Sequence, residues 1–120
     1  MDTLALNLTA DELCSVVQGL RASICSRLWW MMSPSHPIRT CEFDDEMKVL
    51  DDMTQAYSRA MMLAKESEAI VDEFKEYFML SEHVWSMLDV IAKAATWDEV
   101  PVHKHSPLTC PLCEELITAV

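Results

Sequence analysis

Two cysteines and two histidines near the C-terminal end of the chain have residue types and a spacing that could bind a metal ion. Cys110 and Cys113 form a Cys-x₂-Cys pair with a proline between them, and His103 and His105 lie just upstream. This spacing can turn two thiolates toward one ion, and thiolate sulfur and imidazole nitrogen are donors that Zn²⁺ prefers. The pair is half of a site, because a four-cysteine centre needs a second such pair and the sequence has none.

A closed zinc site would therefore need ligands from other segments. One of the two upstream histidines is the expected third ligand, and the fourth is the other histidine, Cys41 or His36. Such a site would be structural and would tie the C-terminal tail to the rest of the fold. The alternative is a loop with two reduced thiols and no metal. A redox role is disfavoured, because redox-active pairs usually lie at a helix N-terminus beside a strand.

Motifs of the common enzyme classes are missing from the sequence. The chain has one glycine, Gly19, which leaves no room for a glycine-rich phosphate loop or a dinucleotide fingerprint. It also has neither the Glu-x-x-His pair of di-iron bundles nor a His-Glu-x-x-His zinc motif. We therefore expect a protein that is not an enzyme.

The scarcity of glycine also indicates that helices, not strands, position these residues. Hairpins and bulges usually need glycine, and 51% of the chain is hydrophobic, as in a globular protein. Thr9 and Glu12 form a capping box that predicts a helix start. Apolar residues then recur at helical spacing up to about Met32: Leu13, Val16, Val17, Leu20, Ile24, Leu28 and Met31.

Pro34 and Pro37 end this first helix, and no proline or glycine follows between residues 38 and 100. An apolar heptad pattern in this span slips near residues 65–68. We expect a turn there, because one helix of about fifty residues could not pack within so small a globule. The turn could instead lie near residues 80–82, where Ser81 could cap a helix.

We expect the helical region to end near residues 97–101, before a loop rich in proline, histidine and cysteine. The predicted fold is all-α: a small antiparallel bundle of three main helices, followed by a short C-terminal helix. The chain is expected to form a single domain (1–120), with the bundle in residues 1–100 and the tail in residues 101–120.

The formal net charge of −11 limits the kinds of partner. It disfavours direct binding to nucleic acid and to anionic membrane surfaces, and it favours a protein partner with a basic surface. The acidic residues cluster at the start of the second predicted helix. Asp44, Asp45, Asp51 and Asp52 are the predicted contacts with a basic partner. The alternative is a solvated face that only keeps the protein soluble.

Trp29, Trp30, Met31 and Met32 are four consecutive large apolar residues near the end of the first predicted helix. Consecutive residues cover more than half of a helix circumference, so they cannot all face one core. We expect them to form a hydrophobic contact surface for the partner or for a second copy in a homodimer. Alternatively, the tail covers them.

The predicted function is that of a small acidic interaction protein that binds a protein partner and modulates or inhibits it. Its sharpest form is a DNA-mimicking acidic face that blocks a nucleic-acid-handling complex, by analogy with small inhibitors of phages and mobile elements. The alternative is a zinc-stabilised structural or regulatory module. The first residues lack a signal-peptide pattern, and no apolar stretch approaches about 18 residues, so we expect a cytoplasmic protein without membrane segments.

Overall fold

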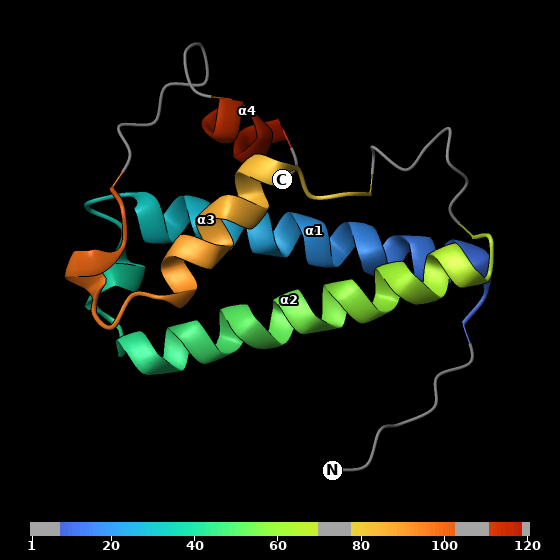
Figure 1. The fold of residues 1–120 in the computed structure, drawn as a ribbon, viewed down its shortest axis with the longest axis horizontal. Coiled ribbons are helices and arrows are strands. Elements are labelled where there is room, and N and C mark those ends of the chain that lie inside the picture. Colours follow the sequence, from blue (N-terminus) through green and yellow to red (C-terminus); the bar gives the residue numbers. More distant parts are fainter. Residues whose placement is uncertain (1–7, 70–77, 103–110, 119–120) are drawn as a thin grey trace.

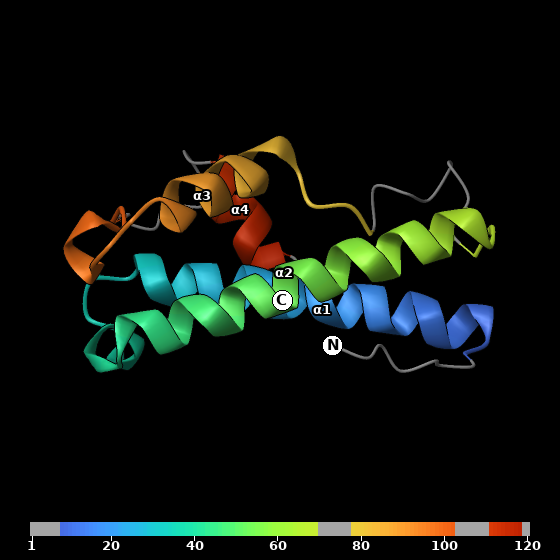
Figure 2. The ribbon, with the colours of Figure 1, turned by 60° about the horizontal axis from the view of Figure 1, so that its bottom comes forward.

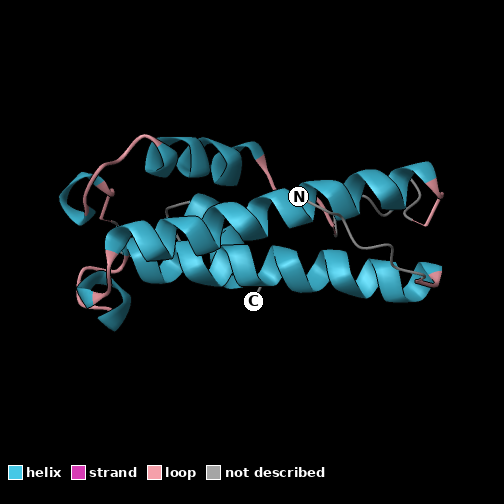
Figure 3. Ribbon diagram, turned by 90° about the horizontal axis from the view of Figure 1, so that it is seen from below, coloured by secondary structure: helices cyan, strands magenta, loops and turns pink. Residues whose placement is uncertain are grey.

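The computed structural model describes residues 8–69, 78–102 and 111–118, and this part of the chain is helical and contains no strand (Figure 3). The all-α class predicted from the sequence is therefore confirmed. Two short 3₁₀ turns, Pro37–Thr40 and Trp97–Glu99, accompany the α-helices. The α-helices are α1 (Ala10–Met32), α2 (Phe43–Glu66), α3 (Glu82–Ala92) and α4 (Pro111–Thr118).

α1 begins at the predicted capping box. The Thr9 hydroxyl accepts a hydrogen bond from the Glu12 N–H (3.2 Å), and the Thr9 N–H donates to the Glu12 carboxylate (3.0 Å). Each bond satisfies a backbone donor that lacks a partner within the helix. The hydrogen bonds from the Thr9 backbone and side chain also lower the pKa of the Glu12 carboxyl.

α1 and α2 run in opposite directions and form a long hairpin (Figure 1). Their facing sides build most of the core, because both helices carry apolar residues at helical spacing. Val16 departs from the predicted stripe, because it is 40% exposed. The buried residues that the two helices contribute include Leu13, Val17, Ile24 and Leu28 from α1, and Leu50, Tyr57, Met61 and Ala64 from α2.

The two candidate turns in the long proline-free span both mark helix ends. α2 ends at Glu66, and Glu68 has a positive φ of 58°, which ends the helical path. Ser81 then caps α3, since its hydroxyl accepts a hydrogen bond from the Val84 N–H at 3.4 Å. α3 is 11 residues long and begins at the second of the two candidate positions, after the non-helical residues 78–81.

α3 and α4 lie on the same side of the α1–α2 hairpin (Figure 2). The short C-terminal helix predicted from the sequence is present as α4, and it packs on α1 and α3. Leu112 and Leu116 of α4 join the core. α4 thus joins α3 to α1.

Three side chains fix the non-helical segments around α3. The Tyr57 hydroxyl donates a hydrogen bond to the Phe78 carbonyl (2.5 Å) and accepts one from the Leu80 N–H (3.1 Å). The Glu115 carboxylate of α4 accepts a hydrogen bond from the Ser81 N–H at 3.1 Å. Arg39 donates to the Met31 carbonyl and to the Trp97 carbonyl, and so connects the end of α1 with the segment after α3.

The apolar segment at the end of α1 differs from its prediction as a contact surface. Met31 and Met32 are fully buried and belong to the core, so neither can touch a partner in this fold. The 3₁₀ turn and the segment around Trp97 fold over this end of α1, which explains why consecutive apolar residues can be buried there. Trp29 is partly buried. Trp30 is 39% exposed, and its ring stacks on His36 at 5.4 Å.

Candidate protein-binding groove

A groove of about 240 Å³ lies between α2 and α3 on the surface of the described part of the chain. Leu50 and Leu88 are buried and form its floor. Trp85 is 39% exposed and forms a wall, and its ring lies 6.2 Å from the ring of Tyr57. The full set of lining residues is Met47, Leu50, Asp51 and Thr54 from α2, with Trp85, Leu88, Asp89 and Ala92 from α3.

Helical spacing explains why these residues share one groove. The residues from each helix fall at positions i, i+3, i+4 and i+7, so they lie on one side of that helix. α3 is held by α4 and by the bonds of Tyr57 to the segment before it, and it does not pack closely along α2. The space between the two helices therefore remains open as a groove with an apolar floor.

An aspartate stands on each side of this groove. Asp51 of α2 accepts a hydrogen bond from the Gln55 amide (2.8 Å), which leaves its negative charge uncompensated by that contact. Asp89 of α3 pairs with Lys93 at 3.0 Å, and both of these side chains are well exposed. Exposed pairs of this kind contribute about 0–1 kcal/mol, so the cation of a partner can compete with Lys93. The groove thus combines apolar depth with an acidic rim.

The four predicted aspartates lie on one exposed face of α2. At about 100° per residue, Asp44, Asp45, Asp51 and Asp52 fall within roughly 120° of the helix circumference. Between residues 44 and 52, the cation in this arc is Lys48, which pairs with Asp52 at 3.8 Å. We call these four aspartates the acidic face. Asp51 belongs to both the acidic face and the groove, so the two features are continuous.

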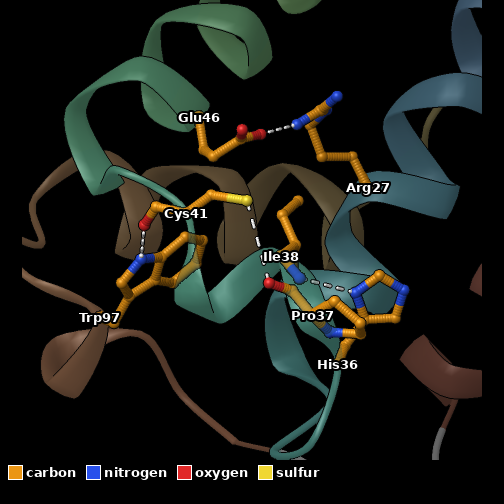
Figure 4. A network of polar contacts seen from close by, with 7 residues as sticks. All are labelled: Arg27, His36, Pro37, Ile38, Cys41, Glu46 and Trp97. Carbon is orange, nitrogen blue, oxygen red and sulfur yellow. Dashed lines mark hydrogen bonds and ion pairs between the residues drawn. The ribbon is translucent and has the colours of Figure 1, made fainter.

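Glu46 is part of the same acidic stretch of sequence but has a different role. Its carboxylate pairs with Arg27 of α1, and both side chains are about four-fifths buried (Figure 4). This pair joins α2 to α1 and directs the charge of Glu46 away from solvent.

Sequence reasoning identified Asp51 but missed Trp85 and Asp89. Trp85 falls on the apolar heptad pattern and therefore resembled a core residue. It is half exposed because α3 does not close against α2. The available signal was Asp89, which lies within about one helical turn of Trp85 and Leu88. A helix side that is wholly buried rarely carries an aspartate.

The predicted metal ligands fall partly outside the described residues. His103, His105 and Cys110 lie there, whereas Cys113 is fully buried in α4. Cys41 is exposed. No group of three or more His, Cys, Asp or Glu side chains suited to a metal occurs among residues 8–69, 78–102 and 111–118. The zinc site therefore stays a prediction.

Two of the candidates for the fourth ligand, His36 and Cys41, do not converge with each other (Figure 4). The His36 imidazole accepts a hydrogen bond from the Ile38 N–H through Nδ1 (3.1 Å) and caps the 3₁₀ turn. The Cys41 thiol donates to the Pro37 carbonyl at 3.8 Å, and the Ile38 and Pro37 segment stands between this sulfur and the imidazole. A site that uses one of these residues would therefore not use the other without a local rearrangement.

Two ionisable groups are buried in the core, Cys25 of α1 and Tyr57 of α2. Burial raises the pKa of the Cys25 thiol to about 11, a shift that Arg21 opposes and Glu115 reinforces. Burial likewise raises the pKa of the Tyr57 hydroxyl. Reactive cysteines require a lowered pKa, so Cys25 remains a protonated core residue at neutral pH and is unsuited to nucleophilic chemistry.

Comparisons with protein-family models, with curated proteins and with solved structures find no match to this chain. None of the helices in the described ranges has the length and apolar character needed to cross a membrane. The groove and the acidic face are therefore the features from which we infer a function.

Proposed function

We propose that this protein is a non-catalytic interaction protein that binds a protein partner through the groove between α2 and α3 and the adjoining acidic face. The observation that carries this proposal is the continuity of the two features, which meet at Asp51. A concave apolar floor supplies area that gains free energy when water is removed, and surrounding charge supplies orientation and specificity.

The charge of the protein supports a basic partner. A net charge of −11 attracts cationic surfaces and increases the rate of encounter with them. A partner that normally holds nucleic acid is the sharpest form of this proposal, because its basic site would accept carboxylates spaced along α2. Binding would then inhibit the partner by occupying that site.

The size of the groove disfavours a small-molecule ligand. Pockets for cofactors and similar ligands usually measure about 300–1,000 Å³ and enclose most of the ligand. A groove of about 240 Å³ is smaller. It is suited to individual side chains presented by a larger partner.

The proposal is tested by capturing the partner at the acidic face and then reversing charges there. A photo-crosslinking residue at Gln55, which is exposed and bonded to Asp51, would identify proteins that touch this face in cells of the natural source. The affinity of the captured partner is then measured for Asp51→Lys combined with Asp52→Lys. We expect a loss of at least about tenfold that shrinks at high salt.

The matched control is Glu66→Lys combined with Glu68→Lys. Both residues are exposed, Glu66 as the last residue of α2 and Glu68 two positions beyond it, and the double substitution changes the net charge by the same amount. The control should keep most of the affinity. Equal losses of affinity in both variants would show that net charge alone governs binding. An unchanged affinity in both would show that the acidic face does not contact the partner.

A further inference from the structure

We propose that the groove binds one amphipathic helix of the partner. A large apolar side chain of this helix lies on the floor formed by Leu50 and Leu88, and lysine or arginine residues lie beside Asp51 and Asp89. This inference rests on the proposed function and names the segment of the partner that is recognised.

The floor of the groove suits an apolar anchor. Leu50 is 3% exposed and Leu88 is 8% exposed, so the bottom is closed by well-packed core residues. Met47 and Trp85 form the sides. Methionine is flexible and polarisable, and it adapts to the shape of an inserted side chain. A single aromatic or leucine side chain would complete this apolar surface and displace water from it.

The rim sets the charge of the bound helix. Asp51 and Asp89 come from opposite sides of the groove, so a helix lying between α2 and α3 passes both carboxylates. Thr54 adds no competing donor, because its hydroxyl donates to the Leu50 carbonyl at 2.8 Å. A helix with cations flanking its apolar stripe satisfies both sides, as in other helix-in-groove complexes.

A helix fits this groove better than an extended strand. Recognition of a strand usually requires an exposed sheet edge that offers backbone hydrogen bonds, and the described residues contain no strand. The groove instead runs between two helices, whose side chains form ridges into which a third helix can pack.

A second copy of this chain is a poorer occupant on grounds of charge. Association through the groove would bring two acidic faces close together, each with aspartates and one partly neutralising lysine. Like charges across an interface oppose association. The rim therefore selects a cationic helix over another copy of an acidic chain.

The test uses a synthetic peptide of about 18 residues, or five helical turns, with leucine and one tryptophan on one face and lysine on the other. A second peptide has the same composition in a scrambled order without an apolar face. Their affinities for the full chain are measured by fluorescence anisotropy. We expect the amphipathic peptide to bind at least about tenfold more tightly than the scrambled one.

Two tryptophan substitutions then locate the binding site. Ala92→Trp fills the groove and should lower the affinity for the amphipathic peptide by at least about tenfold. Ser86→Trp adds the same side chain to an exposed position of α3 outside the groove and should leave the affinity unchanged. Circular dichroism of both variants checks that the helices are retained. A third variant, Asp51→Asn with Asp89→Asn, removes the two charges beside the groove without adding bulk and should also lower the affinity for the peptide.

Several results would overturn the inference. Equal affinities of the two peptides, or a wild-type affinity in Ala92→Trp and in the rim variant, would show that the groove does not seat the helix. A dimer by sedimentation that Ala92→Trp converts to a monomer would assign the groove to a second copy. If the captured partner still responds to charge reversal at Asp51 and Asp52 in these cases, the proposed function stands and only the helix-in-groove inference fails.

Discussion

At the scale of single residues, a few polar side chains decide where α3 lies and therefore whether the groove exists. The Tyr57 hydroxyl bridges the Phe78 carbonyl and the Leu80 N–H, and Glu115 bonds the Ser81 N–H. Together these contacts fix the segment that leads into α3. Neither contact could be read from the sequence, because each joins residues more than 20 positions apart.

Tyr57→Phe should destabilise the protein by about 1–3 kcal/mol, because the Leu80 N–H loses its hydrogen-bond acceptor in a buried position. Urea denaturation measures this change. Ser86→Ala, at an exposed position, serves as the control and should stay within about 0.5 kcal/mol of the parent. A Tyr57→Phe variant as stable as the control would mean that the bridge does not hold α3.

The raised pKa of Cys25 predicts a loss of stability in alkaline solution. The pKa of the thiol is near its ordinary value of 9.0 in the unfolded chain, and burial raises it to about 11 in the folded one. The protonated thiol therefore contributes its full share of stability below pH 9, and this share is lost as the pH rises toward 11. A shift of this size corresponds to roughly 3 kcal/mol.

Denaturation midpoints measured from pH 7 to pH 11 check this prediction. Cys25→Ala should start less stable, because it leaves a small cavity, but its stability should fall less steeply above pH 9. The stability of the Cys25→Ala variant should still fall somewhat with rising pH, because burial also raises the pKa of Tyr57. Parallel profiles of the parent and the variant would refute a role for the Cys25 thiol in the pH dependence.

At the scale of elements, local signals predicted helix ends better than the apolar pattern did. The capping box at Thr9 and the break after Glu66 depend on neighbouring residues, and both are confirmed. The heptad pattern could not decide between the two candidate turns, because it continues through residues 78–81 although the backbone there bonds to Tyr57. The apolar pattern alone could not show that α3 leaves a groove beside α2.

The C-terminal element carries the zinc prediction. Zinc analysis by mass spectrometry, on protein purified without an affinity tag or chelator, should find about one equivalent if His103, His105, Cys110 and Cys113 form the site. Cys110→Ser should then release the metal and lower the melting temperature. Cys14→Ser is the control thiol, because Cys14 lies in α1 and donates to the Ala69 carbonyl. If the wild-type protein contained no zinc, the predicted zinc site would be wrong.

At the scale of the whole molecule, the side formed by α2 and α3 carries the acidic face and the groove. The apolar segment from Trp29 to Met32 at the end of α1 is largely buried. The sequence correctly marked Asp51 as a candidate contact, but it placed Met31 and Met32 on a surface when they are in the core. Burial of consecutive residues requires covering from distant segments, here through Arg39 and Trp97. Such long-range packing is invisible to helical periodicity.

Trp30→Asp tests self-association through the end of α1. Trp30 stacks on His36 of its own chain, and the two adjacent methionines are buried, so little apolar area remains there for a second copy. We expect light scattering to give a monomer mass for the parent and for the variant. A dimeric parent that becomes monomeric on this substitution would instead identify this segment as a homodimer interface.

The central claim is that a partner binds in the groove between α2 and α3, next to the acidic face. The most direct measurement is a two-dimensional amide NMR spectrum of the isotope-labelled full chain, recorded with and without the crosslink-identified partner. The account predicts that the largest shifts fall in residues 47–54 and 85–92, which contain the groove. Shifts concentrated in α1 or in the 3₁₀ turn at Pro37–Thr40, with the groove unchanged, would contradict it.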